Sequence, residues 1–141
     1  MYRRVRVGCD LLPLGIIGSF GSDDILRYIE DYIRTGDLDS LWAVIKRIRL
    51  TYYPSLPDLL LDVSKQYEDE AKKYGPRNWE KGQPLSVYID SGVRHYLKHL
   101  AGKTDEPHLR AFVWNILGAM WTHRNLPEMI DLPFKEVEED A

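Results

Sequence analysis

Hydrophobic residues recur every three or four positions along most of the chain, which is the spacing of one face of an α-helix. After the polar cluster at residues 22–24, typical of a helix N-terminus, the first stripe consists of Ile25, Ile29 and Ile33. Gly36 ends that helix, and a second one follows Asp37 or Asp39, with a stripe formed by Leu41, Val44, Ile45 and Ile48. Residues 22–57 are therefore predicted to form a helical hairpin that serves as scaffold or as an oligomer contact.

Three more helices are predicted after a break at residues 52–57, with Asp58 as the cap of the first. Their apolar stripes are Leu60, Val63, Tyr67, Ala71 and Tyr74; then Leu85, Ile89, Val93, Tyr96, Leu97 and Leu100; then Leu109, Phe112, Val113, Ile116, Leu117 and Met120. The last helix, at about residues 107–124, carries a single full charge, Arg110, between Leu109 and Thr122. Because a helix without a charged face is surrounded by other elements, we expect it to be the central helix.

No strand pattern of any length and no internal repeat interrupts these helices. The sequence thus predicts an all-α fold, a compact bundle of about five helices. We expect a single domain over residues 1–126, with the 22–57 hairpin as an insertion, and then an acidic, solvated C-terminal tail over residues 127–141. Residues 2–7 alternate only loosely and allow a short extended N-terminal arm.

Composition and charge narrow the function classes. The 141 residues fit one domain, and the net charge of -3 gives no field that would attract nucleic acid, so we expect no DNA or RNA partner. A single cysteine, Cys9, excludes an internal disulfide and fits a reducing compartment. No run approaches the roughly 20 apolar residues of a membrane span, and the first residues lack the apolar stretch of a signal peptide. We therefore expect a protein of the cytoplasm without a membrane partner.

One loop, KYGPRNWEKG at Lys73–Gly82, is unusually rich in binding groups. Pro76 within the loop and Pro84 just after it stiffen this connection, and Gly75 and Gly82 allow sharp turns. Its groups that bind anions or stack on rings are Lys73, Arg77, Asn78, Trp79 and Lys81. A loop that is both stiff and rich in such groups is more often a binding site than a simple connection between helices.

Three polar clusters at helix ends or on helix flanks are predicted to converge on one cleft. They are Glu68 and Glu70 with the loop; Asp90, Arg94 and His95; and Asp105, Glu106 and His108 at the start of the central helix. Carboxylates beside cations and a tryptophan suggest a magnesium-dependent site for a phosphorylated nucleotide, because Mg²⁺ binds a few carboxylates together with substrate phosphates.

Each cluster also has a structural interpretation. Glu68 and Lys72 have the spacing of an ordinary ion pair on a solvated helix face. His95 and His99 have the spacing of a zinc-binding pair, but two surface histidines are the simpler interpretation, because no cysteine or carboxylate shares their flank. The pair Asp105-Glu106 is also a common charge pattern at a helix N-terminus.

The chain resembles a phage and prophage family, the N-terminal domain of dATP/dGTP diphosphohydrolases. The resemblance rests on DLLPLG (Asp10–Gly15), EDEAKKYGPRNWEKG (Glu68–Gly82) and YIDSGVRHYLKHLAGKTDEPHLRAFVWNILGAMWTHRN (Tyr88–Asn125). That family is similar to the MazG-like all-α nucleotide pyrophosphohydrolases, which are helical bundles, usually dimers or tetramers. The matching positions are Lys73, Tyr74, Arg77, Asn78, Trp79, Arg94, His95, Asp105, Glu106, His108 and Asn115.

The resemblance implies a metal-dependent pyrophosphohydrolase that converts a (deoxy)nucleoside triphosphate to monophosphate and pyrophosphate. One or two Mg²⁺ (or Mn²⁺) ions would be held by Glu68, Asp105, Glu106 and Asp90 and would activate water. Charge on the phosphates would be offset by Arg94, Lys73 and Arg77, with Lys81, Tyr74 and Asn115 nearby. The base would be held by Trp79 and Asn78, and a carboxylate or water would be oriented by His95 or His108.

A second function class remains open from the sequence. A phage-encoded protein that sequesters a nucleotide or a nucleotide signal without turnover would need the same cations and rings. In both classes the expected partner is a nucleotide, the expected assembly is a homo-oligomer, and the expected location is the cytoplasm of the host cell if the chain is phage-encoded.

Overall fold

A computed structural model describes residues 8–20 and 24–136. Its α-helices are α1 (Leu14–Phe20), α2 (Asp24–Thr35), α3 (Leu38–Tyr52), α4 (Leu56–Tyr74), α5 (Leu85–Leu100) and α6 (His108–Asn125). Short 3-10 helices are η1 (Cys9–Leu11), η2 (Asn78–Lys81) and η3 (Pro127–Met129). The described residues contain no strand, so the predicted all-α fold is confirmed. The predicted N-terminal arm lies outside the described residues.

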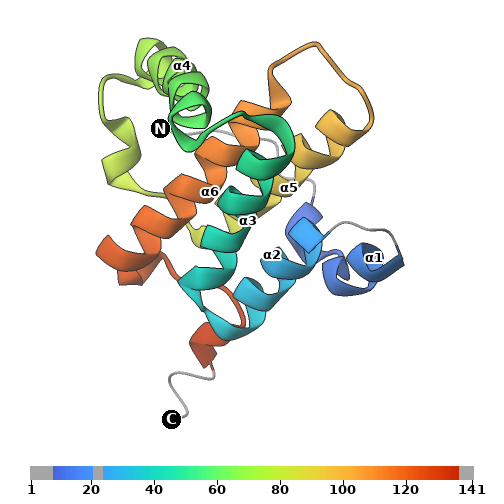
Figure 1. The fold of residues 1–141 in the computed structure, drawn as a ribbon. Helices are drawn as coiled ribbons and strands as arrows, with labels where there is room; N and C mark the ends of the chain where they lie inside the picture. Colours follow the sequence, from blue (N-terminus) through green and yellow to red (C-terminus); the bar gives the residue numbers. More distant parts are fainter. Residues whose placement is uncertain (1–7, 21–23, 137–141) are drawn as a thin grey trace.

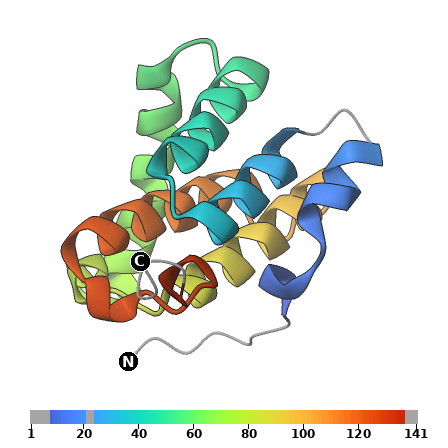
Figure 2. The same cartoon turned by 90° about the horizontal axis from the view of Figure 1, so that it is seen from below.

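Helix α6 is the central element, as its lack of a charged face predicts. It packs against α5 along its length and also contacts α4 and α3 (Figure 1). Phe112, Val113 and Ile116 are buried against residues of the other helices. Figure 2 shows the α2–α3 hairpin on one side of the α5–α6 pair, so the hairpin supplies part of the same core.

Two glycines allow α5 and α6 to approach closely. A Cβ atom on Gly118 of α6 would lie 2.6 Å from the ring of Tyr88, which is fully buried on α5. A Cβ atom on Gly92 of α5 would lie 3.3 Å from the Cβ atom of Asn115. Any larger residue at Gly118 would displace Tyr88, so this position fixes the distance between the two helices.

Helix α4 begins earlier than the sequence suggests. Ser55, rather than Asp58, is its N-cap, because the Ser55 side chain accepts a hydrogen bond from the Asp58 backbone N–H. Pro57 is compatible with this start because the first-turn N–H groups of a helix have no partner within it. The buried stripe also shifts, since Leu59 is buried while Leu60 is exposed.

The segment after Asn125 differs from the solvated tail that its acidic composition predicts. Ile130, Leu132 and Phe134 are buried in the core. Asp131 accepts hydrogen bonds from the backbone N–H and hydroxyl of Ser86 and thereby caps the start of α5. The apolar residues between the acidic ones are what dock the segment, and residues 137–141 lie outside the described part of the chain.

Within residues 8–20 and 24–136, no helix has both the length and the hydropathy that a membrane-spanning segment requires.

Candidate functional site

A chain of hydrogen bonds links α5 to the start of α6. The Nδ1 atoms of His95 and His108 lie 2.9 Å apart, and His108 Nε2 lies 2.8 Å from a carboxylate oxygen of Asp105. Both imidazoles are buried, whereas Asp105 is exposed in the α5–α6 loop. The sequence interpretation of His95 and His99 as two surface histidines is wrong for His95, whose partner is His108.

The chemistry of the three groups fixes the direction of these hydrogen bonds. An ionised carboxylate can only accept, so His108 Nε2 donates to Asp105. The hydrogen bond from His108 is the main reason why the pKa of Asp105 is lowered, which keeps the carboxylate ionised. With both rings neutral, His108 Nδ1 is then an acceptor and His95 Nδ1 donates to it.

Glu106 completes a set of possible metal ligands with the two histidines. One donor atom from each of His95, Glu106 and His108 can be chosen so that all three lie within 4.8 Å of one another. Two imidazoles and a carboxylate form a donor set that divalent transition metals prefer, and oxygen-only Mg²⁺ sites are built differently. If a metal were bound, Asp105 would accept the hydrogen bond from His108 Nε2 and orient that ring, as carboxylates commonly do for metal-bound histidines.

A groove of about 490 Å³ opens beside this cluster. It is lined by Tyr53, Asp62, His99, Lys103, Thr104, Asp105, Glu106, Pro107, His108, Leu109 and Arg110. The hydroxyl of Tyr53 donates to Asp62 at 2.6 Å, and burial, followed by this hydrogen bond, raises the pKa of Tyr53. Lys103 is exposed, so the groove has a cation available to solvent at its edge.

The loop Lys73–Gly82 forms a second cavity, of about 280 Å³, between the end of α4 and η2. Its wall is made by Tyr67, Glu68, Glu70, Ala71, Gly75, Pro76, Arg77, Asn78, Trp79 and Trp114. Among the described residues, Arg77 is the only non-glycine with a positive φ (57°), and Gly75 and Gly82 also have positive φ. The left-handed turns bring Arg77, Asn78 and Trp79 back toward α4. We call this cavity the aromatic slot.

The rings of the slot support one another edge-on. Trp79 lies 6.3 Å from Tyr67 and 5.1 Å from Trp121, at interplanar angles of 84° and 87°. Tyr67 also contacts Trp114 at 6.2 Å. Such edge-to-face contacts hold the indole of Trp79 in a defined orientation.

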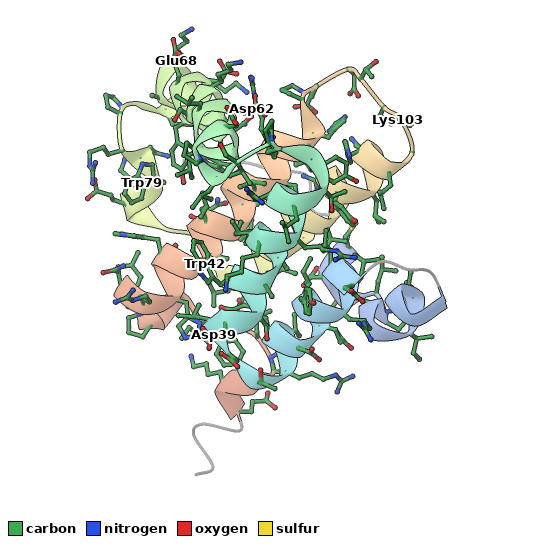
Figure 3. The ribbon with its side chains drawn as sticks, in the orientation of Figure 1. Asp39, Trp42, Asp62, Glu68, Trp79 and Lys103 are labelled. Atoms are coloured by element: carbon green, nitrogen blue, oxygen red, sulfur yellow. The ribbon has the colours of Figure 1, made fainter. Side chains whose placement is uncertain are left out.

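The predicted site residues do not all meet in one place. Glu68 is exposed, pairs with Lys72 at 3.5 Å and lines the slot, whereas Asp105 and Glu106 line the groove. Figure 3 shows Trp79 and Lys103 on either side of α4 in that view. The one cleft expected from the sequence is thus divided into a groove and a slot.

Three other predicted residues have structural partners. Asp90 is buried, accepts a hydrogen bond from the backbone N–H of Cys9 at 2.7 Å and pairs with Arg94 at 3.4 Å. Asn115 is buried between α5 and α6, where its side-chain amide donates to the carbonyl of Ala111. The remaining loop cations, Lys73 and Lys81, are exposed, and Tyr74 is half-buried.

One predicted carboxylate, Glu70, has partners for which the sequence predicted no role. Glu70 is a buried carboxylate in the slot, held by the amide of Gln66 at 3.1 Å. Arg110 donates to Gln66 at 3.4 Å and to Asp69 at 2.8 Å, which connects α6 to α4. The presence of Arg110 as the single charge of an otherwise apolar helix was the signal in the sequence, because a lone charge on a buried helix needs a partner.

A comparison with known protein families shows which family the chain belongs to. A family model described as dATP/dGTP diphosphohydrolase, N-terminal, matches residues 43–131. The chain belongs to this family. The match contains every predicted site residue, and α1 and α2 lie before it. No curated protein and no solved structure matches the chain. The family's description implies a nucleotide substrate and a hydrolase.

Proposed function

We propose that this protein hydrolyses a purine deoxynucleoside triphosphate to the monophosphate and pyrophosphate with a divalent cation. The observation that carries the proposal is the cluster of His95, His108, Asp105 and Glu106 at the edge of an open groove. The description of the matched family, dATP/dGTP diphosphohydrolase, supports both the reaction and the substrate class.

The residues of the cluster fit a cation held by His95, Glu106 and His108. The Nδ1 atoms of His95 and His108 lie 2.9 Å apart, so the two rings are close enough to serve as ligands of one cation. Asp105 would accept the remaining N–H of His108 and keep that ring oriented. This donor set favours Mn²⁺ over Mg²⁺, because imidazole is a poor ligand for Mg²⁺. A bound cation would lower the pKa of a water molecule and neutralise phosphate charge.

Two residues that line the groove, Lys103 and Glu106, then act on the substrate. Lys103 attracts the phosphate chain and offsets the charge that develops on it. The oxygen of a water molecule bonds to the α-phosphorus, and the bond from that phosphorus to the oxygen bridging to the β-phosphate breaks. Pyrophosphate leaves with the electron pair, and the proton of the water passes to the carboxylate of Glu106.

Chromatography of a reaction mixture tests the proposal directly. The purified protein is incubated with dGTP or dATP in Mn²⁺, Mg²⁺ or EDTA, and the expected products are the monophosphate and pyrophosphate, most rapidly in Mn²⁺. Glu106→Gln should remove this activity, and Glu128→Gln, at an exposed carboxylate on η3, should keep it. Intact nucleotide recovered after tight binding would instead identify a nucleotide-sequestering protein.

A further inference from the structure

The aromatic slot is separate from the groove that carries the proposed chemistry, and its chemistry is different. Three of its ten lining residues are aromatic, namely Tyr67, Trp79 and Trp114. Its volume of about 280 Å³ is just below the roughly 300–1,000 Å³ of typical ligand pockets. A cavity of this size suits one heterocycle better than a complete nucleotide.

A planar group already lies on the face of the indole. The guanidinium carbon of Arg77 is 4.8 Å from the centre of the Trp79 ring, and the Arg77 side chain is largely exposed. Arg77 also pairs with Glu80, three residues along the loop. The face of Trp79 therefore accepts flat groups, and stacking of a base on an aromatic side chain contributes about 1–3 kcal/mol.

The slot also contains a carboxylate with little solvent around it. Glu70 is 9% exposed and lines the slot from α4. A carboxylate at this depth is costly unless it accepts hydrogen bonds. The amide of Gln66 donates to one of its oxygens at 3.1 Å, and the carboxylate lines the slot, where an ionised carboxylate accepts hydrogen bonds from N–H groups.

Glu70 is also held in a fixed direction. Arg110 Nε donates to the carbonyl oxygen of Gln66, so the amide nitrogen of Gln66 points at Glu70. Arg110 is itself fixed by its ion pair with Asp69. This chain of contacts, Asp69–Arg110–Gln66–Glu70, runs from the groove, which Arg110 lines, to the slot, which Glu70 lines. The orientation of the carboxylate is therefore set by α6 as well as by α4.

Burial raises the pKa of Tyr67 to about 12, so its phenol stays neutral at physiological pH. The polar groups that line the slot beside it are then Glu70, Asn78 and, at the rim, Glu68 and Arg77. Of the two carboxylates, only Glu70 is buried; Glu68 is exposed and paired with Lys72.

From this arrangement we propose that the slot is a guanine-selective base site, in which the base stacks on Trp79 and the carboxylate of Glu70 accepts hydrogen bonds from its N1–H and 2-amino groups. Among the four DNA bases, only guanine presents two adjacent N–H donors on its pairing edge. Adenine would place the lone pair of its N1 against the carboxylate, which leaves two acceptors facing each other. The assignment of the slot to the substrate's base rests on the proposed function.

Equilibrium binding of monophosphates tests the site without turnover. Calorimetry with dGMP, dAMP and dIMP in EDTA should show dGMP binding at least about tenfold more tightly than dAMP, as expected of a site built around hydrogen bonds. The ligand dIMP lacks the 2-amino group and should bind more weakly than dGMP. Because the comparison of ligands uses the unaltered protein, it does not depend on whether a variant folds.

Single substitutions test which residue causes the preference for guanine. Glu70→Gln should weaken dGMP by about tenfold or more, remove the difference between dGMP and dIMP, and favour dAMP, since an amide offers one donor and one acceptor to adenine. Glu128→Gln, at an exposed carboxylate on η3 that lines neither cavity, should change none of these. Trp79→Leu should weaken all three ligands by a similar factor, and Trp42→Leu, at an exposed tryptophan outside the slot, should weaken none.

Three results would overturn the inference: equal affinity of the unaltered protein for dGMP and dAMP, an equal loss for both in Glu70→Gln, or an effect of Glu128→Gln as large as that of Glu70→Gln. These results are independent of the proposed function. A guanine preference without hydrolysis would refute only the reaction, and hydrolysis in which Glu70→Gln leaves the dGTP-to-dATP ratio of kcat/KM unchanged would refute only the base site.

Discussion

The histidine cluster and the aromatic slot are built by opposite means. At the start of α6, the His95–His108–Asp105 chain depends on hydrogen bonds of 2.8–2.9 Å that join α5, α6 and the loop between them. In the aromatic slot, a loop with left-handed turns places rings 5–6 Å apart, edge to face. Hydrogen bonds fail with small displacements, whereas ring contacts tolerate them. Helix packing therefore sets the precision of the histidine cluster, and the stiffness of the loop sets the shape of the slot.

The largest effect is expected from the buried histidine of the cluster. His95→Ala removes a proposed ligand and the partner of His108, so we expect Mn²⁺ binding to be lost and kcat/KM to fall by more than about 100-fold. Dissociation constants from Mn²⁺ titration and product chromatography measure both quantities. The matched control is His123→Ala on α6, where the imidazole contacts Tyr32 and Phe134 and lines neither cavity. Equal losses in the two variants would show that the cluster has no special role.

A smaller effect is expected at Asp105, whose carboxylate accepts a hydrogen bond from His108. Asp105→Asn keeps an acceptor for His108 but removes its charge, so we expect kcat/KM to fall by about 10–100-fold while the urea midpoint barely moves. Base selectivity, measured as the dGMP-to-dAMP affinity ratio, should stay unchanged. A change in that ratio would show that the two regions are not independent.

The packing of α5 on α6 should affect both regions at once. Gly118→Ala forces a methyl group against Tyr88, which also contacts Trp114 of the slot wall at 6.1 Å. We expect a loss of about 1–3 kcal/mol in the free energy of unfolding, measured by urea denaturation. Weaker dGMP binding together with weaker Mn²⁺ binding would follow from the same displacement. Unaltered stability would mean that the helices can separate without cost.

The smallest effect is expected at Asp131, which lines neither cavity. Asp131→Ala removes the cap of α5 that Ser86 uses, which should cost about 0.5–2 kcal/mol of stability. Mn²⁺ affinity and the dGMP-to-dAMP ratio should stay the same at temperatures well below the melting point. A loss of base selectivity in this variant would link the slot to the start of α5.

Much of the fold follows from periodicity. The stripe on α2 and the uncharged surface of α6 predict which faces are buried, and the structure buries Ile29, Phe112 and Ile116 accordingly. The pattern was less informative at α4, where Leu59 rather than Leu60 is buried, because both leucines fit a helical stripe and only the neighbouring helices distinguish them. Composition was misleading after Asn125, since acidic residues alternate there with residues that dock, such as Phe134.

The sequence by itself determined the helical class, the central position of α6 and the residue types of the site, because each of these depends on the local spacing of side chains along a helix. The tertiary structure decided which polar groups meet. It paired His95 with His108 instead of His99, placed Glu68 in the slot and Glu106 in the groove, and aligned Gln66 between Arg110 and Glu70. Those contacts depend on the distances between helices, which glycines such as Gly118 and the turns around Arg77 set, and the periodicity of one helix carries no record of the distance to another.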